Sequence, residues 1–165
     1  MEMVAMLSFR KIEPADDKRI AEIIRGNLER FHLDISGTAY FDPELDRLST
    51  YYNSEPSERA YFVALGAGGE VVGGVGIAKF SGIESCSELQ KLYLDDSVKG
   101  RGYGKELIRI AEDWASSVGY ENLYLETHTN LTTALKLYEK MGFRQIEKPC
   151  STLHSTMNRF YLKKL

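Results

Sequence analysis

The chain has 165 residues and a formal net charge of -3, so it lacks the basic excess of a nucleic-acid-binding protein. Its composition, 43% hydrophobic and 27% charged residues, is typical of a globular protein with one core. Two cysteines form neither a disulfide scaffold nor a metal-ligand spacing, and no apolar run is long enough to span a membrane. The N-terminal stretch becomes charged too early for a signal peptide. We therefore expect one domain over residues 1–165, located in the cytoplasm, with no metal and no membrane or nucleic-acid partner.

The first third of the chain predicts a strand, a helix and an irregular segment. Apolar and polar residues alternate over residues 7–12, which is typical of a short strand. Residues 16–31 should form a helix, because apolar residues recur at helical spacing and two aspartates suit its positive N-terminal end. Residues 32–56 show no clean period. We expect an irregular, partly helical lid there, with one short helix near residues 44–52.

The middle of the chain predicts three adjacent strands. Residues 61–65 and 71–80 flank the glycine-rich turn GAGG and indicate a hairpin, and SCSELQKLYLDD follows as a third strand. Gly73, Gly74 and Gly76 lie within the second of these strands. They indicate a bulge or a close approach of the backbone to a neighbouring group.

The rest of the chain alternates helices with strands. A helix with an apolar face follows the next glycine-rich stretch and ends at Gly119. NLYLETHT is a strand, LTTALKLYEKM is a second helix closed by Gly142, and FRQIEK and STMNRFYLKKL are two final strands. This order of elements predicts an α/β (α+β) fold in which helices pack on a mixed sheet.

The stretch VKGRGYGKELI places Gly100, Gly102 and Gly104 between a strand and a helix. Glycine lets backbone N–H groups converge without side chains in the way, and a helix start adds unpaired N–H groups and partial positive charge. The stretch therefore predicts a phosphate cradle. It is not a Walker loop, because Lys105 is followed by Glu106, and not the fingerprint GxGxxG, because position 105 is not glycine.

This glycine stretch resembles the acetyl-CoA loop of the GNAT family of N-acetyltransferases, whose pattern is [Gln/Arg]-x-x-Gly-x-[Gly/Ala]. Lys99 then takes the cationic position, followed by Gly102 and Gly104. SELQKLYL resembles the family's fourth strand, and NLYLETHTNLTTALKLYEKMGF resembles its fifth strand and the next helix. The resemblance implies a mixed, mostly antiparallel sheet of six to seven strands, with helices on both faces. Its parallel fourth and fifth strands would splay apart around the pantetheine arm of the cofactor.

The resemblance also implies acetyl-CoA as the cosubstrate and direct transfer of acetyl to a primary amine, without a metal. The glycine loop would hold the pyrophosphate through its backbone. The fourth strand would offer backbone groups to the pantetheine arm and one N–H to the thioester oxygen. Asn130 would contact the pantetheine amides or cap the following helix. The cofactor-binding residues expected on this basis are Leu92, Tyr93, Leu94, Lys99, Gly100, Arg101, Gly102, Tyr103, Gly104, Lys105 and Asn130.

Two residues are candidates for the chemistry, again by resemblance. Tyr138 would donate a proton or a hydrogen bond to the departing thiolate, although a tyrosine on an apolar helix face equally fits a core position. Glu88 would take the proton of the amine through water, anchor a cationic acceptor, or simply be an exposed strand carboxylate. Glu126 on the neighbouring strand could share this role, and His128 lies nearby in the sequence.

The acceptor is left open between a small-molecule amine and a peptide amine. In the family, two regions wall the acceptor pocket, and in this chain they hold Tyr40, Phe41, Tyr51, Tyr52 and His154, which could equally be core residues. A homodimer is also left open, in which the final strand would pair across an interface.

The alternative function is a CoA-binding sensor or regulatory module without turnover. A pure binder needs neither Tyr138 nor Glu88, so their presence favours the enzyme.

Overall fold

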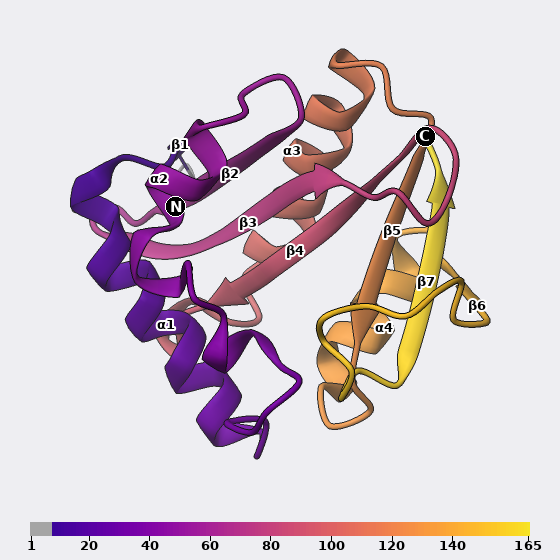
Figure 1. Cartoon of the computed structure of the whole chain (residues 1–165). Helices are drawn as coiled ribbons and strands as arrows, with labels where there is room; N and C mark the ends of the chain where they lie inside the picture. Colours follow the sequence, from indigo (N-terminus) through magenta and orange to yellow (C-terminus); the bar gives the residue numbers. More distant parts are fainter. Residues whose placement is uncertain (1–7) are drawn as a thin grey trace, which may run out of the picture.

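A computed structural model describes residues 8–165, and its strands form one seven-stranded sheet in the order β1-β2-β3-β4-β5-β7-β6 (Figure 1). The strands are β1 (Ser8–Lys11), β2 (Arg59–Leu65), β3 (Val71–Lys79), β4 (Cys86–Leu94), β5 (Asn122–Thr127), β6 (Arg144–Ile146) and β7 (Arg159–Lys164). The α-helices are α1 (Asp17–Arg30), α2 (Leu48–Asn53), α3 (Tyr103–Ser117) and α4 (Thr132–Lys140), with short 3-10 helices at Pro14–Asp16, Ala39–Phe41, Leu45–Arg47 and Asp96–Val98.

The predicted element order and the mixed, mostly antiparallel sheet are confirmed. β4 and β5 are parallel, and the other neighbouring strands pair antiparallel. The start of the first predicted strand, at Leu7, lies outside the described residues.

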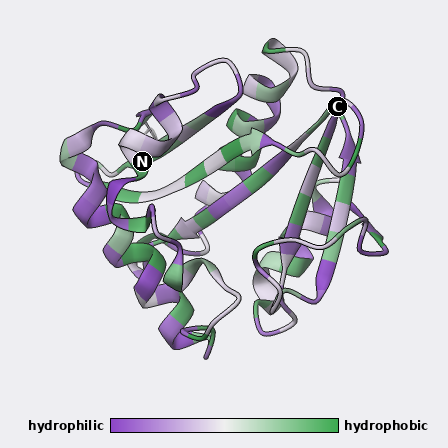
Figure 2. Ribbon diagram, in the orientation of Figure 1, coloured by the Kyte–Doolittle hydropathy of each residue, from purple (hydrophilic) through white to green (hydrophobic). Residues whose placement is uncertain are grey.

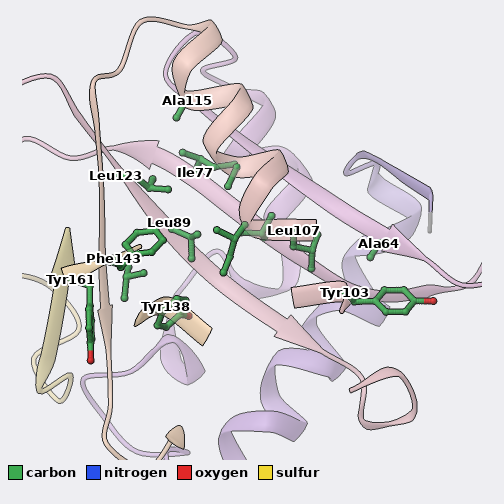
Figure 3. Close-up of a cluster of buried hydrophobic side chains, with 14 of the residues drawn as sticks. Ala64, Ile77, Leu89, Tyr103, Leu107, Ala115, Leu123, Tyr138, Phe143 and Tyr161 are labelled. Carbon is green, nitrogen blue, oxygen red and sulfur yellow. The ribbon is translucent and has the colours of Figure 1, made fainter. Parts of the chain in front are cut away.

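Helices cover both faces of the sheet, as expected. α1 and α2 pack on one face, and α3 and α4 pack on the other (Figure 1). α1 forms because buried residues such as Ile20 and Ile24 recur on one side of it, and Figure 2 shows polar residues on the outer sides of the helices. On the other face, Leu107 of α3 joins Ile77 of β3 and Leu89 of β4 in the larger core cluster (Figure 3).

β4 and β5 pair only at their beginnings. Residues Cys86, Ser87 and Glu88 of β4 pair with Asn122, Leu123 and Tyr124 of β5, and the pairing ends there. Beyond this point the two strands diverge as a V (Figure 1). The predicted splay is therefore confirmed. Strand edges that part in this way leave backbone N–H and C=O groups without a strand partner, so a ligand can reach the main chain there.

β4 also carries one extra residue opposite β3. Gly76 pairs with Gln90 and Gly74 pairs with Tyr93, so two residues of β4 face one residue of β3. Lys91, within this bulge, has a φ of 49°. The extra residue reverses the alternation of side chains along β4.

The glycines of β3 make room for the tyrosines that support the bulge. A Cβ at Gly74 would lie 2.8 Å from the Tyr61 hydroxyl oxygen, and one at Gly76 would lie 2.7 Å from the Tyr52 ring. The Tyr61 hydroxyl donates a 2.9 Å hydrogen bond to the carbonyl of Lys91. The predicted close approach is confirmed, whereas the extra residue of this bulge lies on β4, opposite the glycines.

β7 is an interior strand of the sheet. It pairs with β5 on one side, and along Phe160, Tyr161 and Leu162 it pairs with β6 on the other. Along these three residues the final strand has no free edge for a second copy of the chain. The homodimer stays a prediction, but pairing through these residues is not how it could form.

Two segments outside the sheet meet near the open end of the V (Figure 1). Residues 32–56 are irregular and partly helical, as predicted. Thr156 in residues 147–158 donates its backbone N–H to the carbonyl of Gly37 at 3.1 Å. We call residues 32–56 and 147–158 the covering segments.

Candidate active site

A cavity of about 690 Å³ lies in the V between β4 and β5. Its walls come from β4, the glycine loop, the first turn of α3, the end of β5 and α4. Most of the predicted cofactor-binding residues meet there, together with Tyr138: Leu92, Tyr93, Leu94, Lys99, Gly100, Gly102, Tyr103, Gly104 and Lys105. Arg101 is exposed and, like Asn130, is not part of the wall.

The glycine loop presents a row of unpaired backbone donors. None of the N–H groups from Gly100 to Lys105 donates a hydrogen bond to another described residue. The loop adopts this shape because Gly100 and Gly102 have φ values of 77° and 85°, in the left-handed region that side chains disfavour. Gly102 directly precedes α3, so the positive end of the helix dipole adds to the row. The loop is therefore built as an anion cradle.

Three lysines lie beside the cradle, and they differ in whether their charge is already paired. Lys105 and Lys140 line the cavity, and neither forms an ion pair within residues 8–165. Lys99 also lines it, but its Nζ lies 2.7 Å from Asp96 and donates a 2.6 Å hydrogen bond to Asn27 Oδ1. The Lys99 charge is thus partly neutralised, and Lys105 and Lys140 remain as counter-charges for an anion.

Asn27 of α1 is a site residue that sequence reasoning missed. Its buried side chain donates to the carbonyl of Ile23 at 2.8 Å and to the carbonyl of Leu94 at 2.9 Å, and it accepts from Lys99. It therefore ties α1 to the end of β4 and to the glycine loop. A polar residue on the apolar face of the predicted helix was the available signal, because a buried amide needs partners.

Tyr138 of α4 lies in the wall of the cavity with 6% of its surface exposed. Its ring packs against Phe143 and Tyr161, with centroids 5.9 Å and 6.2 Å away (Figure 3). Its hydroxyl forms no hydrogen bond with the part of the chain that the structure describes. Burial raises the pKa of this phenol above its ordinary value, because the phenolate would lose its hydration. The group therefore stays protonated and can donate a hydrogen bond to a ligand.

Glu88 lines a second cavity of about 50 Å³, which adjoins the first. Lys91, Tyr93 and Glu126 line both cavities, so the two spaces meet at the bulge of β4. Glu88 and Tyr138 therefore lie at neighbouring parts of one site rather than facing a single cavity.

A short chain of hydrogen bonds ends at the Glu88 carboxylate. The buried Tyr52 hydroxyl donates to Gln90 Oε1 at 2.7 Å, and Gln90 Nε2 donates to Glu88 Oε1 at 2.7 Å. Burial raises the pKa of Glu88 to about 7, and the hydrogen bond from Gln90 acts in the opposite direction. A carboxyl group with this pKa exchanges a proton readily near neutral pH.

Replacing Glu88 with glutamine is expected to stabilise the fold above neutral pH. An unperturbed glutamate ionises near 4.5, and Glu88 in the fold ionises near 7, so stability falls as pH rises between these values and stays lower above them. Glu88→Gln removes this cost, on the order of 2 kcal/mol or about 5 °C in melting temperature at about pH 8. Thermal unfolding followed by circular dichroism at about pH 4.5 and about pH 8 checks this. An equal gain at both pH values would contradict it.

A buried charge cluster joins the bulge to both covering segments. Lys91 is 4% exposed at its side chain, and its Nζ lies 2.7 Å from Asp42 and 3.6 Å from Glu44. His154 Nε2 lies 2.8 Å from the same Asp42 carboxylate. His154 lines the small cavity, and its place beside an acceptor stays a prediction.

The predicted aromatic wall is not part of either cavity. The cavity linings do not include Tyr40, Phe41, Tyr51 or Tyr52. From this part of the chain, Ala39 lines the small cavity. Tyr52 is fully buried in the core, whereas Phe41 is 62% exposed. For Tyr52 the core alternative is therefore correct.

Asn130 and His128 shape the turn before α4. The Asn130 side chain donates to the carbonyl of Phe31 at 2.9 Å, and its backbone N–H donates to His128 Nδ1 at 3.0 Å. Leu131, not Asn130, precedes α4, so the predicted helix cap is wrong. In this arrangement both residues link segments of the chain and lie outside the cavity wall.

Comparison with known proteins identifies the family. The profile of the Acetyltransferase (GNAT) family matches residues 27–143, which include β4, the glycine loop, β5 and α4. The chain belongs to the GNAT family. The "Uncharacterized N-acetyltransferase YjgM" of Escherichia coli is 39% identical over 140 residues, which are 84% of this chain and 82% of that protein. This GNAT protein is therefore an enzyme of the acyltransferase class.

Solved GNAT structures share the fold. An acetyltransferase of the GNAT family from Staphylococcus aureus has a TM-score of 0.84 at 20% identity, over 96% of this chain and 99% of that one. The PaiA N-acetyltransferase from Thermoplasma acidophilum, crystallised with coenzyme A, has a TM-score of 0.75 at 19% identity, over 97% and 99%.

Two further findings concern the part of this GNAT protein that the structure describes. Residues 8–165 include no helix both long and apolar enough to cross a bilayer. Over the same residues, no three His, Cys, Asp or Glu side chains are grouped so that they could hold a metal ion.

Proposed function

We propose that this GNAT protein transfers acetyl from acetyl-CoA directly to a primary amine of a small molecule or peptide. The observation that carries the proposal is the row of unpaired backbone N–H groups from Gly100 to Lys105 on the wall of the large cavity. Such a row suits a pyrophosphate, and Lys105 and Lys140 add positive charge beside it.

The rest of the cavity fits the arm of the same cosubstrate. Its volume of about 690 Å³ lies in the ordinary range for ligand sites. Leu92 and Leu94 give it an apolar side on β4, and Ala134 and Leu137 give it another on α4. Acetyl-CoA supplies an acetyl group activated as a thioester.

Glu88 acts as the general base, and Tyr138 acts as the hydrogen-bond donor to the leaving group. Glu88, with a pKa of about 7, accepts the proton that the amine must lose before its lone pair can attack. A bond then forms between the amine nitrogen and the acetyl carbon, the carbon–sulfur bond breaks, and the electron pair leaves on sulfur. Tyr138 donates a hydrogen bond to that sulfur. Full proton transfer is disfavoured, because burial raises the Tyr138 pKa well above the value of about 8.5 for a thiol.

The bulge of β4 supplies a donor for the carbonyl oxygen. Tyr61 holds the carbonyl of Lys91, and the N–H of the same trans peptide, on Leu92, points the opposite way. Leu92 lines the cavity. We assign its N–H the role of stabilising negative charge on the acetyl oxygen.

A covalent route through cysteine is not supported. Cys86 is buried, and burial raises the pKa of its thiol to about 12. Cys150 is exposed, and neither cysteine lines either of the two cavities described above. Thiolate is the nucleophilic form, so Cys86 is a poor nucleophile at neutral pH.

Replacing Gly102 with alanine tests the cradle, and Gly69→Ala is a matched control. The two glycines have φ values of 85° and 83°, and an added Cβ would meet nothing within 4 Å at either. Each change should therefore cost about 1 kcal/mol of stability through backbone strain. Only Gly102→Ala alters the row of donors, so we expect its Kd for acetyl-CoA in calorimetric titration to rise at least about tenfold.

Two outcomes of this titration would contradict the proposal. If wild-type protein fails to bind acetyl-CoA, the cradle holds something else. If Gly102→Ala and Gly69→Ala bind acetyl-CoA equally well, the row of N–H groups is not the pyrophosphate site.

A further inference from the structure

We propose that the acceptor carries two ammonium groups, of which one reacts beside Glu88 and the other is held by Glu126. This inference rests on the proposed function and names the chemical class of its acceptor.

The charges of the joined cavities have a clear polarity. The glycine-loop end carries Lys99, Lys105 and Lys140. The opposite end, where the cavities meet, carries Glu88 and Glu126. An anionic group is thus favoured at one end and a cationic group at the other.

Lys91, the cation at the acceptor end, is already paired. Its buried ammonium lies 2.7 Å from Asp42 and 3.6 Å from Glu44. His154, the other basic residue there, has its Nε2 2.8 Å from Asp42. Neither residue is therefore free to receive the carboxylate of an amino-acid acceptor.

Glu126 is held in place without being neutralised. Its carboxylate accepts hydrogen bonds from the Tyr124 hydroxyl at 2.9 Å and from the Thr152 hydroxyl at 2.8 Å. Within residues 8–165 no lysine, arginine or histidine pairs with it. Hydroxyl donors orient a carboxylate but leave its charge in place, and an ammonium is the complementary group.

Glu88 and Glu126 stand on the two strands that part. Glu88 pairs with Tyr124 in the last paired position of β4 and β5, and Glu126 follows two residues later on β5. Because residues two apart on a strand share a face, the two carboxylates lie on the same face of the sheet, on either side of the point where the strands part. Both line the small cavity. One of them can act as the base while the other anchors a second ammonium.

The test compares three acceptors of matched length: diaminobutane, butylamine and γ-aminobutyrate. Thiol release is measured at saturating acetyl-CoA, and the product is identified by mass. We expect kcat/KM for diaminobutane to exceed that for butylamine by about tenfold or more, with γ-aminobutyrate the poorest because its carboxylate meets uncompensated negative charge. Diaminopropane and diaminopentane extend the series, so that chain length alone does not decide the result.

Glu126→Gln separates an anchor from a structural residue. The amide oxygen still accepts from Tyr124 and Thr152, but the charge is gone. We expect kcat/KM to fall at least about tenfold more for diaminobutane than for butylamine, because only the diamine has a second ammonium for Glu126 to hold. Loss of both activities together would indicate a structural role and would contradict the anchor. If the variant does not fold, the wild-type series decides alone.

The outcomes distinguish a failure of the diamine inference from a failure of the proposed acetyl transfer. If butylamine or γ-aminobutyrate matches diaminobutane, the inference is wrong and the acetyl transfer stands. If acetyl-CoA binds and no diamine reacts, the inference is again wrong and the donor site stands. If acetyl-CoA does not bind, both the diamine inference and the proposed function are wrong.

Discussion

Replacing Glu88 with glutamine is expected to lower kcat/KM by about 100-fold or more at about pH 7.5, with no change in the Kd for acetyl-CoA. The variant keeps an oxygen that can accept the hydrogen bond from Gln90, so the local contacts are preserved. What it loses is the group that takes the proton from the amine. Glu70→Gln, at an exposed position in the turn between β2 and β3, is the control and should behave as wild type.

The pH profile gives the sharper signature of Glu88. In the wild type, kcat/KM should rise to about pH 7, where Glu88 ionises, and stay level up to the amine pKa of about 10. The variant can use only amine that has already lost its proton in solution. Its kcat/KM should therefore keep rising between about pH 7 and about pH 10. Its deficit should shrink about tenfold per pH unit. A variant that keeps the break near neutral pH would show that another group is the base.

Replacing Tyr138 with phenylalanine is expected to lower kcat by about 10- to 100-fold while acetyl-CoA binds as before. The ring contacts with Phe143 and Tyr161 remain, and only the hydroxyl is lost. The thiolate then leaves without a hydrogen bond from the protein. Steady-state thiol release and calorimetric titration measure the two quantities separately.

Tyr93→Phe is the matched control for Tyr138→Phe. Tyr93 is a partly buried phenol that lines both cavities, and desolvation raises its pKa too. If the loss of kcat follows Tyr93 instead, the assignment of Tyr138 is wrong. If neither change affects turnover, the departing sulfur needs no donor. A wild type that binds acetyl-CoA and acetylates no amine would favour the sensor alternative.

The regular elements and the donor end of the site were predictable because their signals are local. Helical spacing in α1 and alternation in the strands reflect which side chains face the core. The glycine loop was predictable because Gly100 and Gly102 require backbone conformations that other residues avoid. The splay of β4 from β5 came from resemblance to the GNAT family, and no periodicity in the sequence indicates it.

The acceptor end was not predictable, because its contacts join residues far apart in the sequence. Asp42 meets Lys91 and His154, which belong to a strand and to a loop near the end of the chain. At the glycine-loop end, the contact between Asn27 and Lys99 across 72 positions was missed for the same reason. Aromatic residues in an irregular segment gave no periodic signal for burial, so Tyr52 could not be assigned to the core from sequence.

The covering segments have a consequence for how such a chain can diverge. They belong to no strand ladder, so an insertion or deletion in residues 32–56 or 147–158 shifts no register in the sheet. The glycine loop, by contrast, is fixed between β4 and α3. Under the proposed function, gene duplicates could therefore change their choice of acceptor by altering these two segments while inheriting the acetyl-CoA end intact.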